Sequence, residues 1–372
     1  MFIRPRKPEP EPHVRHTLSE LGYEFDLTSG KLRNSSTGEP YEYSAFGTDK
    51  KKNAELYQSL LAPASRDVYR VLQSDLGMEP IAVPDSRQPH CNIYVTPGGL
   101  TKKHLVVIVT GHGVSGGVWA WNVLVKEGLR AGSVIEYVRG CVKRGYGLLV
   151  LNPNENIVAS DGLPETFNTY VGHSTPIHGN ETPDEHVGYV WSRIIRGSSV
   201  ETVAFVAYNT AGIAVIDLLR YDFARFIGKS VGIAFIDSVH STFKLERGAL
   251  AWLGLAAKQW ENSAEPADSL LEDDRVGCVS VSAGNPSDCR ELAPMACMES
   301  VLDFISSCFE RGTIETSLDN ELSDNDGTES VDLSDADSGT DTDAIDDLTA
   351  IDSIQVVQPG GHVVDDGCIG WD

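Results

Sequence analysis

Short apolar runs alternate with stretches of helical periodicity along most of this chain. The runs are continuous rather than alternating, as in strands that are buried on both faces of a sheet. Because helical patterns separate most of them, we expect an α/β fold with a mainly parallel sheet covered by helices on both faces. Strands are predicted at residues 81–83, 92–95, 105–110, 147–151, 203–207, 231–236 and 277–281, the first two antiparallel at one edge.

Helices are predicted at residues 51–76, 119–129, 182–195, 213–219, 250–260 and 301–309. The first should be interrupted near Pro63, which has no N–H to donate. The third has a complete start signal, with Thr182 as N-cap, Pro183 in the first position and Glu185 closing a capping box. A hairpin or irregular segment is expected over residues 18–43.

The chain is centred on residues 202–219, where a buried strand, a turn of small residues and a helix follow one another. This layout is typical of the nucleophile elbow of α/β-hydrolases, which carries Ser, Cys or Asp at its tip. Here the turn is Tyr208-Asn209-Thr210-Ala211-Gly212, with Asn209 at the tip. A carboxamide has no ionisable proton and cannot attack a carbonyl group. The pattern therefore predicts an α/β-hydrolase-like scaffold without its usual nucleophile.

The formal net charge of -24 is unevenly distributed. No Lys or Arg follows Arg311, and 17 Asp and Glu do, so residues 1–311 carry about -7. That balance gives no indication of a nucleic-acid groove. Composition predicts a disordered leader over residues 1–16 and a disordered acidic tail over residues 312–372. The domain between them, residues 17–311, would carry a surface insertion over about residues 157–181.

The seven cysteines form no C-x-x-C pair, which argues against a zinc site or a disulfide framework and favours reduced thiols. No apolar run is long enough to span a bilayer, so no membrane association is predicted. Residues 111–116 match G-x-G-x-x-G between a strand and a helix. The following strand ends at Asn152 rather than at the acidic residue that a dinucleotide site uses, so no cofactor is expected.

The same loop contains a literal G-x-S-x-G, which makes Ser115 an alternative nucleophile. The loop follows an early strand, however, where hydrolases place backbone N–H donors of the oxyanion hole. A glycine-rich turn is therefore the favoured interpretation. Gly111, Gly113 and Ser115 remain candidates for a binding loop.

Polar residues also follow two other strands, at the sheet edge where open α/β sheets bind ligands. Asp237 could orient a general base or bond nearby backbone, and for His240 a structural role is favoured. After the last strand, the position that often carries the base histidine holds no His, and Arg290 is found there. Further candidates for a polar binding edge are Asn152, Asn154, Asn156 and Tyr208, although a turn held by asparagine side chains is the favoured interpretation for the three asparagines.

These blocks, in this order, resemble the Arb-two (Argonaute-binding protein two) domain family. The matching stretches span residues 18–309 and are LSELGYEFDLTSGKLRNSSTGEPYEY, RGYGLLVLNPNEN, TPDEHVGYVWSRII, TVAFVAYNTAGIAVIDLL, AFIDSVHS and VSVSAG. The resemblance implies an α/β-hydrolase fold and a nuclear role in small-RNA silencing or chromatin regulation, with Argonaute or chromatin proteins as partners. It implies no established reaction.

Animal members of this family look as if they carry H-S-Y-G-G at the elbow and H-E-L after the last strand. This chain has Y-N-T-A-G and Arg290-Glu-Leu at those places, so only the acid, Asp237, is retained. Since the members of a catalytic triad act as a unit, the resemblance implies a degenerate triad at Asn209, Asp237 and Arg290.

In the acidic tail, Ile354, Val356 and Val357 form a short β-prone core downstream of several aspartates. Such a segment resembles a SUMO-interacting motif, which adds a strand to the edge of a partner's sheet.

Together these features predict a non-catalytic adaptor in nuclear small-RNA silencing, heterochromatin or cotranscriptional regulation. The alternatives are a serine hydrolase that uses Ser115 with Asp237 and His240, and a pocket-bearing sensor of small molecules. The expected location is the nucleus, with the cytoplasm as an additional place.

Overall fold

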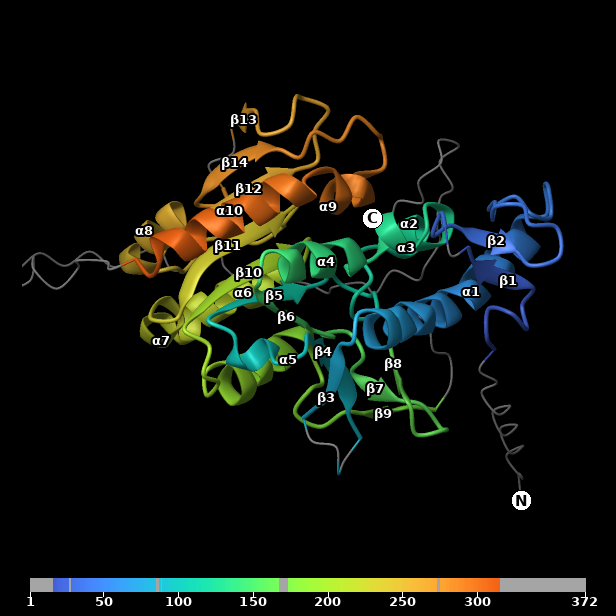
Figure 1. Ribbon diagram of the computed structural model, residues 1–372, viewed down its shortest axis with the longest axis horizontal. Coiled ribbons are helices and arrows are strands. Elements are labelled where there is room, and N and C mark those ends of the chain that lie inside the picture. The colour runs from blue at the N-terminus through green and yellow to red at the C-terminus, as the bar shows by residue number, and fades with distance from the viewer. Residues whose placement is uncertain are drawn as a thin grey trace, which may run out of the picture. The chain divides into compact units, whose positions relative to one another are not determined.

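The computed structural model describes residues 16–26, 28–84, 87, 89–166, 173–272 and 275–314 (Figure 1). Apart from residues 16 and 312–314, the predicted leader and acidic tail lie outside these ranges, and so do Ile354, Val356 and Val357.

A nine-stranded sheet forms the centre of the fold, in the order β13-β14-β12-β11-β10-β5-β6-β4-β3. The six strands from β14 to β6 pair in parallel, and the strands at both edges are antiparallel. The sheet is thus mostly parallel, as the alternation of strands and helices predicts. Its strands are β3 Glu79–Val83, β4 Cys91–Val95, β5 His104–Val109, β6 Gly147–Val150, β10 Thr202–Tyr208, β11 Ser230–Ile236, β12 Ala257–Glu261, β13 Leu270–Leu271 and β14 Val279–Ser282.

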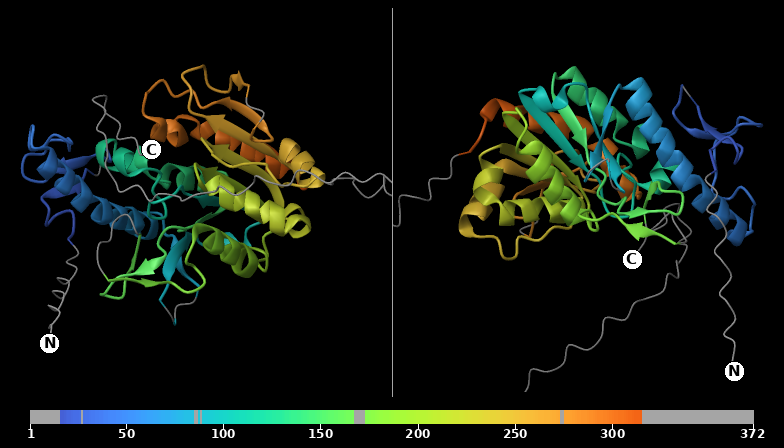
Figure 2. Two further views of the ribbon diagram at one scale, coloured as in Figure 1. Left: turned by 180° about the vertical axis from the view of Figure 1, so that it is seen from behind. Right: turned by 90° about the horizontal axis from the view of Figure 1, so that it is seen from below.

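Helices cover both faces of this sheet (Figure 2). Alternate residues of β5 show the division, because Val106 and Ile108 belong to one core cluster and Leu105 and Val107 to the other. The first cluster includes α1 Lys50–Arg70, α2 Trp121–Lys126, α4 Ile135–Lys143 and α10 Met298–Arg311, and the second includes α5 Pro183–Tyr189, α6 Ala211–Tyr221, α7 Phe223–Ile227 and α8 Arg247–Ala256. Shorter helical segments are η1 Val71–Asp75, η2 Gly99–Thr101, α3 Leu129–Gly132, η3 Val190–Ile195, η4 Arg290–Leu292 and α9 Ala293–Ala296.

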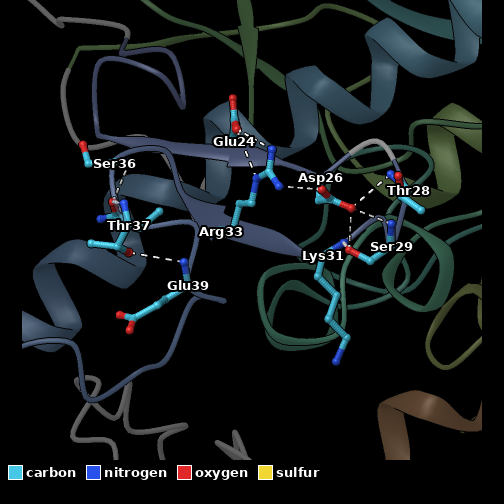
Figure 3. A network of polar contacts seen from close by, with 10 residues as sticks. Glu24, Asp26, Thr28, Ser29, Lys31, Arg33, Ser36, Thr37 and Glu39 are labelled. Atoms are coloured by element: carbon cyan, nitrogen blue, oxygen red, sulfur yellow. Dashed lines mark hydrogen bonds and ion pairs between the residues drawn. The ribbon is translucent and has the colours of Figure 1, made fainter.

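Two small sheets lie outside the central one. β1 Tyr23–Phe25 and β2 Leu32–Asn34 form the expected hairpin, in which Arg33 bridges Glu24 and Asp26 at 3.1 and 2.6 Å (Figure 3). β7 Ile157–Val158, β8 Pro164–Glu165 and β9 Thr175–Pro176 form a three-stranded sheet within the predicted surface insertion.

Three helix predictions need correction. α1 continues through Pro63, because the buried residues Leu60, Leu61 and Ala64 pack in the core and outweigh one lost backbone hydrogen bond. The helix predicted at residues 119–129 spans only Trp121–Lys126. Ala120 before it is extended, and Gly128 after it adopts a φ of 91°.

The helix predicted at residues 250–260 ends at Ala256, and β12 begins at the next residue. Strand pairing with β11 on one side and β14 on the other decides this conformation, which a local pattern does not contain. The capping box at Thr182 and Glu185 is confirmed.

Among the described residues, no single helix has the length and apolar character to cross a membrane. The pair 290–296 and 298–311, bent by 53°, meets that criterion only when its two parts are taken together.

Candidate functional site

The predicted elbow is present between β10 and α6. Asn209 adopts a φ of 53°, which is uncommon for a residue other than glycine and is the kind of strained turn that a nucleophile elbow uses. Gly212 allows close approach, because a Cβ there would lie 2.0 Å from Ser238 Oγ. The turn therefore has the shape of an elbow with an amide at its tip.

The backbone donors of the expected oxyanion hole are already bonded to side chains of the turn. In α/β-hydrolases these donors are the N–H after the nucleophile and an N–H from an earlier strand loop. Here Thr210 N–H donates to Asn209 Oδ1 at 2.8 Å, and His112 N–H donates to Thr210 Oγ1 at 2.7 Å. Two side chains of the turn thus occupy the place of a substrate oxygen. Thr210 was not a sequence candidate, and no local signal marks it.

The acid and base positions do come together, but as an ion pair. Asp237 follows β11, is 7% exposed, and accepts from Arg290 Nη2 at 2.8 Å and from Arg290 Nε at 3.2 Å. Hydrogen bonds to this carboxylate and its charge raise the pKa of Arg290 above its ordinary range. Because a guanidinium stays protonated, Arg290 cannot accept a proton from a nucleophile.

His240 lies in the buried layer beneath this edge. Its Nδ1 is 2.8 Å from Ser238 Oγ, its Nε2 is 2.9 Å from the carbonyl oxygen of Val276, and its ring stacks on Phe235. A carbonyl can only accept, so Nε2 carries the proton and Nδ1 accepts from Ser238. Both ring nitrogens are therefore engaged, and the geometry supports a structural role.

Ser115 is buried beside Glu155 and Tyr69. The glycines of its loop have structural contacts. Gly111 O accepts from Asn154 Nδ2 at 2.7 Å, and Gly113 O accepts from Trp121 Nε1 at 3.0 Å. The loop thus forms a braced turn in which the serine hydroxyl faces a carboxyl group.

The three asparagines after β6 are buried and fix neighbouring loops. Asn152 Oδ1 accepts from Gly116 N–H at 2.8 Å and its amide donates to Glu155 Oε2 at 2.7 Å. The Asn154 amide donates to two loop carbonyls, and the Asn156 amide donates to the carbonyl oxygens of Pro153 and Asn180. Tyr208, the remaining candidate, is buried edge-on against Trp119. These side chains serve mainly to hold the edge together.

Two buried titratable groups support the same edge. Burial raises the pKa of Glu155 to about 7, although Tyr69 and Asn152 donate to it at 2.5 and 2.7 Å. Burial lowers the pKa of His186 to about 3, and its Nε2 accepts from Asn152 N–H at 3.1 Å. Cys91 Sγ lies 3.8 Å from His186 Nδ1, but burial raises the pKa of this thiol, so it is not an activated nucleophile.

Two clefts open at this edge of the sheet. The first, of about 220 Å³, lies between the elbow helix and the start of α5, and includes Gly111, His112, Asn154 and Thr210. The second, of about 530 Å³, includes Asp237, Gln259, Glu261 and Arg290. Over the described ranges, no group of three or more His, Cys, Asp or Glu side chains is placed to hold a metal ion.

Comparisons with known proteins agree with the resemblance seen in the sequence. The model of the Arb2 domain matches residues 14–267. The cotranscriptional regulator ARB2A of Mus musculus is 29% identical over 351 residues, covering 82% of this chain and 84% of that protein. The Homo sapiens protein of that name is 28% identical over 353 residues, covering 83% and 84%. Among solved structures, a histone deacetylase from Saccharomyces cerevisiae matches with a TM-score of 0.44 and 13% identity, covering 68% of this chain and 98% of that one.

Proposed function

This chain belongs to the Arb2 domain family, and we propose that it is a non-catalytic, α/β-hydrolase-like adaptor in nuclear gene regulation. The observation that carries the proposal is the closed elbow. Asn209 replaces the nucleophile, its side chain and that of Thr210 occupy the two N–H donors, and Arg290 neutralises Asp237. Acyl transfer needs a nucleophile, a base and an open oxyanion hole together, and the positions of Asn209, Thr210 and Arg290 supply none of the three.

The regulatory part of the proposal rests on the relatives, which are named cotranscriptional regulators. That name supports a place in the nucleus. The proposed partners, Argonaute or chromatin proteins, come from the family resemblance of the sequence. The tail residues Ile354, Val356 and Val357 would add binding to SUMO.

Labelling with a fluorophosphonate probe tests the absence of catalysis. We expect the folded wild-type chain and Ser115→Ala to show the same background as heat-denatured protein, while an active serine hydrolase in the same experiment is labelled. Labelling that disappears in Ser115→Ala would overturn the proposal in favour of the serine hydrolase. Labelling that survives that substitution would reveal a nucleophile elsewhere.

Restoring a nucleophile and a base at the elbow tests which features prevent catalysis there. Asn209→Ser with Arg290→His should restore a nucleophile and a base but leave His112 N–H bonded to Thr210. Adding Thr210→Ala frees that donor, and we expect the labelling rate to rise by about 10²-fold, the usual effect of one oxyanion-hole donor. Equal rates with and without Thr210→Ala would contradict the capped oxyanion hole.

Affinity capture of the full chain from nuclear extract tests the partners. We expect Argonaute or chromatin proteins to be enriched over a tag-only control. In a separate measurement, purified SUMO should bind the wild-type chain and lose binding when Ile354, Val356 and Val357 are replaced by serine. A partner set without Argonaute or chromatin proteins would contradict the nuclear assignment.

A pocket-bearing sensor is the second candidate function, because two clefts persist beside an elbow that lacks a nucleophile. The larger of these clefts is lined by charged side chains of both signs.

A further inference from the structure

The larger cleft lies over the carboxyl end of β12, beside the loops that follow β11 and precede β14. Gln259 of β12 is one of the residues that line it, and Val239 and Val276 supply apolar surface. The cleft, of about 530 Å³, has room for a molecule the size of an amino acid.

The amide of Gln259 is incompletely bonded. The residue is 2% exposed, and its Nε2 donates to Glu261 Oε1 at 3.2 Å. Its Oε1 is buried and has no hydrogen-bond partner within the described part of the chain. Because buried polar atoms are nearly always bonded, an unpaired carbonyl in a cleft wall indicates a site for a donor group of a ligand.

The charges that line the cleft are balanced. Two carboxylates, Asp237 and Glu261, lie with two guanidinium groups, Arg275 and Arg290. An ion of one sign would gain little from this arrangement, whereas a molecule with separated positive and negative groups can pair with both kinds of side chain. Arg290 is 67% exposed and uses Nε and Nη2 on Asp237, so Nη1 is available for a ligand carboxylate.

We propose that this cleft binds a free α-amino acid. Its ammonium group would donate to Gln259 Oε1 and to the carboxylate of Glu261, and its carboxylate would accept from Arg290. The inference rests on that part of the proposed function in which Asp237 and Arg290 form a fixed ion pair instead of transferring protons. It requires no partner protein.

Titration calorimetry of the full-length chain with each of the twenty L-amino acids tests the proposal. We expect at least one to bind saturably, and its N-acetyl and α-amide derivatives to bind at least tenfold more weakly, because each lacks one of the two charges. An amide that binds as tightly as the free amino acid would overturn the role of Arg290. Absence of binding by all twenty would overturn the proposal, and the fluorophosphonate experiment would still decide on catalysis separately.

Two variants separate binding from folding. Gln259→Leu removes the unpaired carbonyl, so we expect the chain to stay folded and its affinity to fall at least tenfold. Ser230→Ala is the matched control. The Ser230 hydroxyl is also buried with no hydrogen-bond partner among the described residues, but it lies at the start of β11, whereas the cleft lies past the end of that strand. The affinity of Ser230→Ala should equal that of the wild type. Unchanged affinity in Gln259→Leu would contradict the proposal.

Should Gln259→Leu fail to fold, Arg290→Gln gives an independent answer. It should weaken binding of the amino acid at least tenfold and leave the weak binding of the α-amide unchanged. An equal loss for both ligands would point to a general disturbance of the cleft and would count against the proposed contact.

Discussion

Glu155→Gln is expected to gain about 3 kcal/mol of stability relative to the wild-type chain as the pH rises from 4.5 to 7. The pKa of Glu155 is about 7 in the folded chain, compared with an ordinary value of 4.5. Between these values the folded wild type binds more protons than the unfolded chain, so its stability falls with rising pH. Because glutamine does not titrate, the stability of Glu155→Gln does not fall with rising pH for this reason.

The same variant should reveal the opposite effect of His186. Burial lowers the pKa of this imidazole from 6.5 to about 3, so the stability it contributes is present above pH 6.5 and is lost as the pH falls through 3. In the wild type, Glu155 and His186 oppose each other between pH 4.5 and 6.5. Without Glu155, stability should rise with pH across that window by up to about 1.4 kcal/mol per unit.

Urea unfolding of both chains from pH 4.5 to 7.5 measures this difference. Tyr69→Phe is the informative companion, since it removes a donor to Glu155 and should raise the pKa of that carboxyl further. The stability of Tyr69→Phe should therefore keep falling with rising pH up to a higher pH than the stability of the wild type does. A difference between Glu155→Gln and wild type that does not vary with pH would contradict the assignment.

Phe226→Ala is expected to reduce the free energy of unfolding by about 4 kcal/mol. Phe226 of α7 is fully buried, with ring centroids of Trp191, Phe205 and Trp252 at 5.3, 5.4 and 5.6 Å. Replacing a buried aromatic ring by a methyl group loses its burial and leaves a cavity, which typically costs about 3–5 kcal/mol.

Phe243→Ala is the matched control for this experiment. Phe243 is 73% exposed, and the hydrogen bond that it accepts from Arg220 uses its backbone carbonyl. Its substitution should change stability by no more than about 0.5 kcal/mol. Similar unfolding midpoints for the two variants in urea would show that the aromatic cluster does not stabilise the chain as its packing indicates.

The sequence predicted the fold well because the strands of a buried parallel sheet have a simple pattern. Continuous apolar runs located most central strands, and the turn at Asn209 located the elbow between β10 and α6. β12 escaped detection, since its conformation depends on strands at both sides that are distant in the chain.

The contacts of the site were less accessible to sequence reasoning. The family pattern named Asp237 and Arg290 as positions of one degenerate triad, and the structure brings them together as an ion pair that the sequence did not predict. The roles of Thr210, His186 and Gln259 arise from side chains that meet across separate loops. The spacing of residues along the chain does not predict contacts of this kind.

The parallel order of the sheet has a practical consequence for mapping interactions with shortened chains. The Arb2 match ends at residue 267, so this residue is an obvious choice for the end of a truncated protein. A fragment ending there would lack β14, the neighbour of β12, and α10, whose Phe304 packs against Trp260 at 5.5 Å. If such a fragment failed to bind a partner, the cause would be unfolding of the sheet edge, and the result would not locate the binding site. Point substitutions in the intact chain are therefore the sound way to locate its contacts.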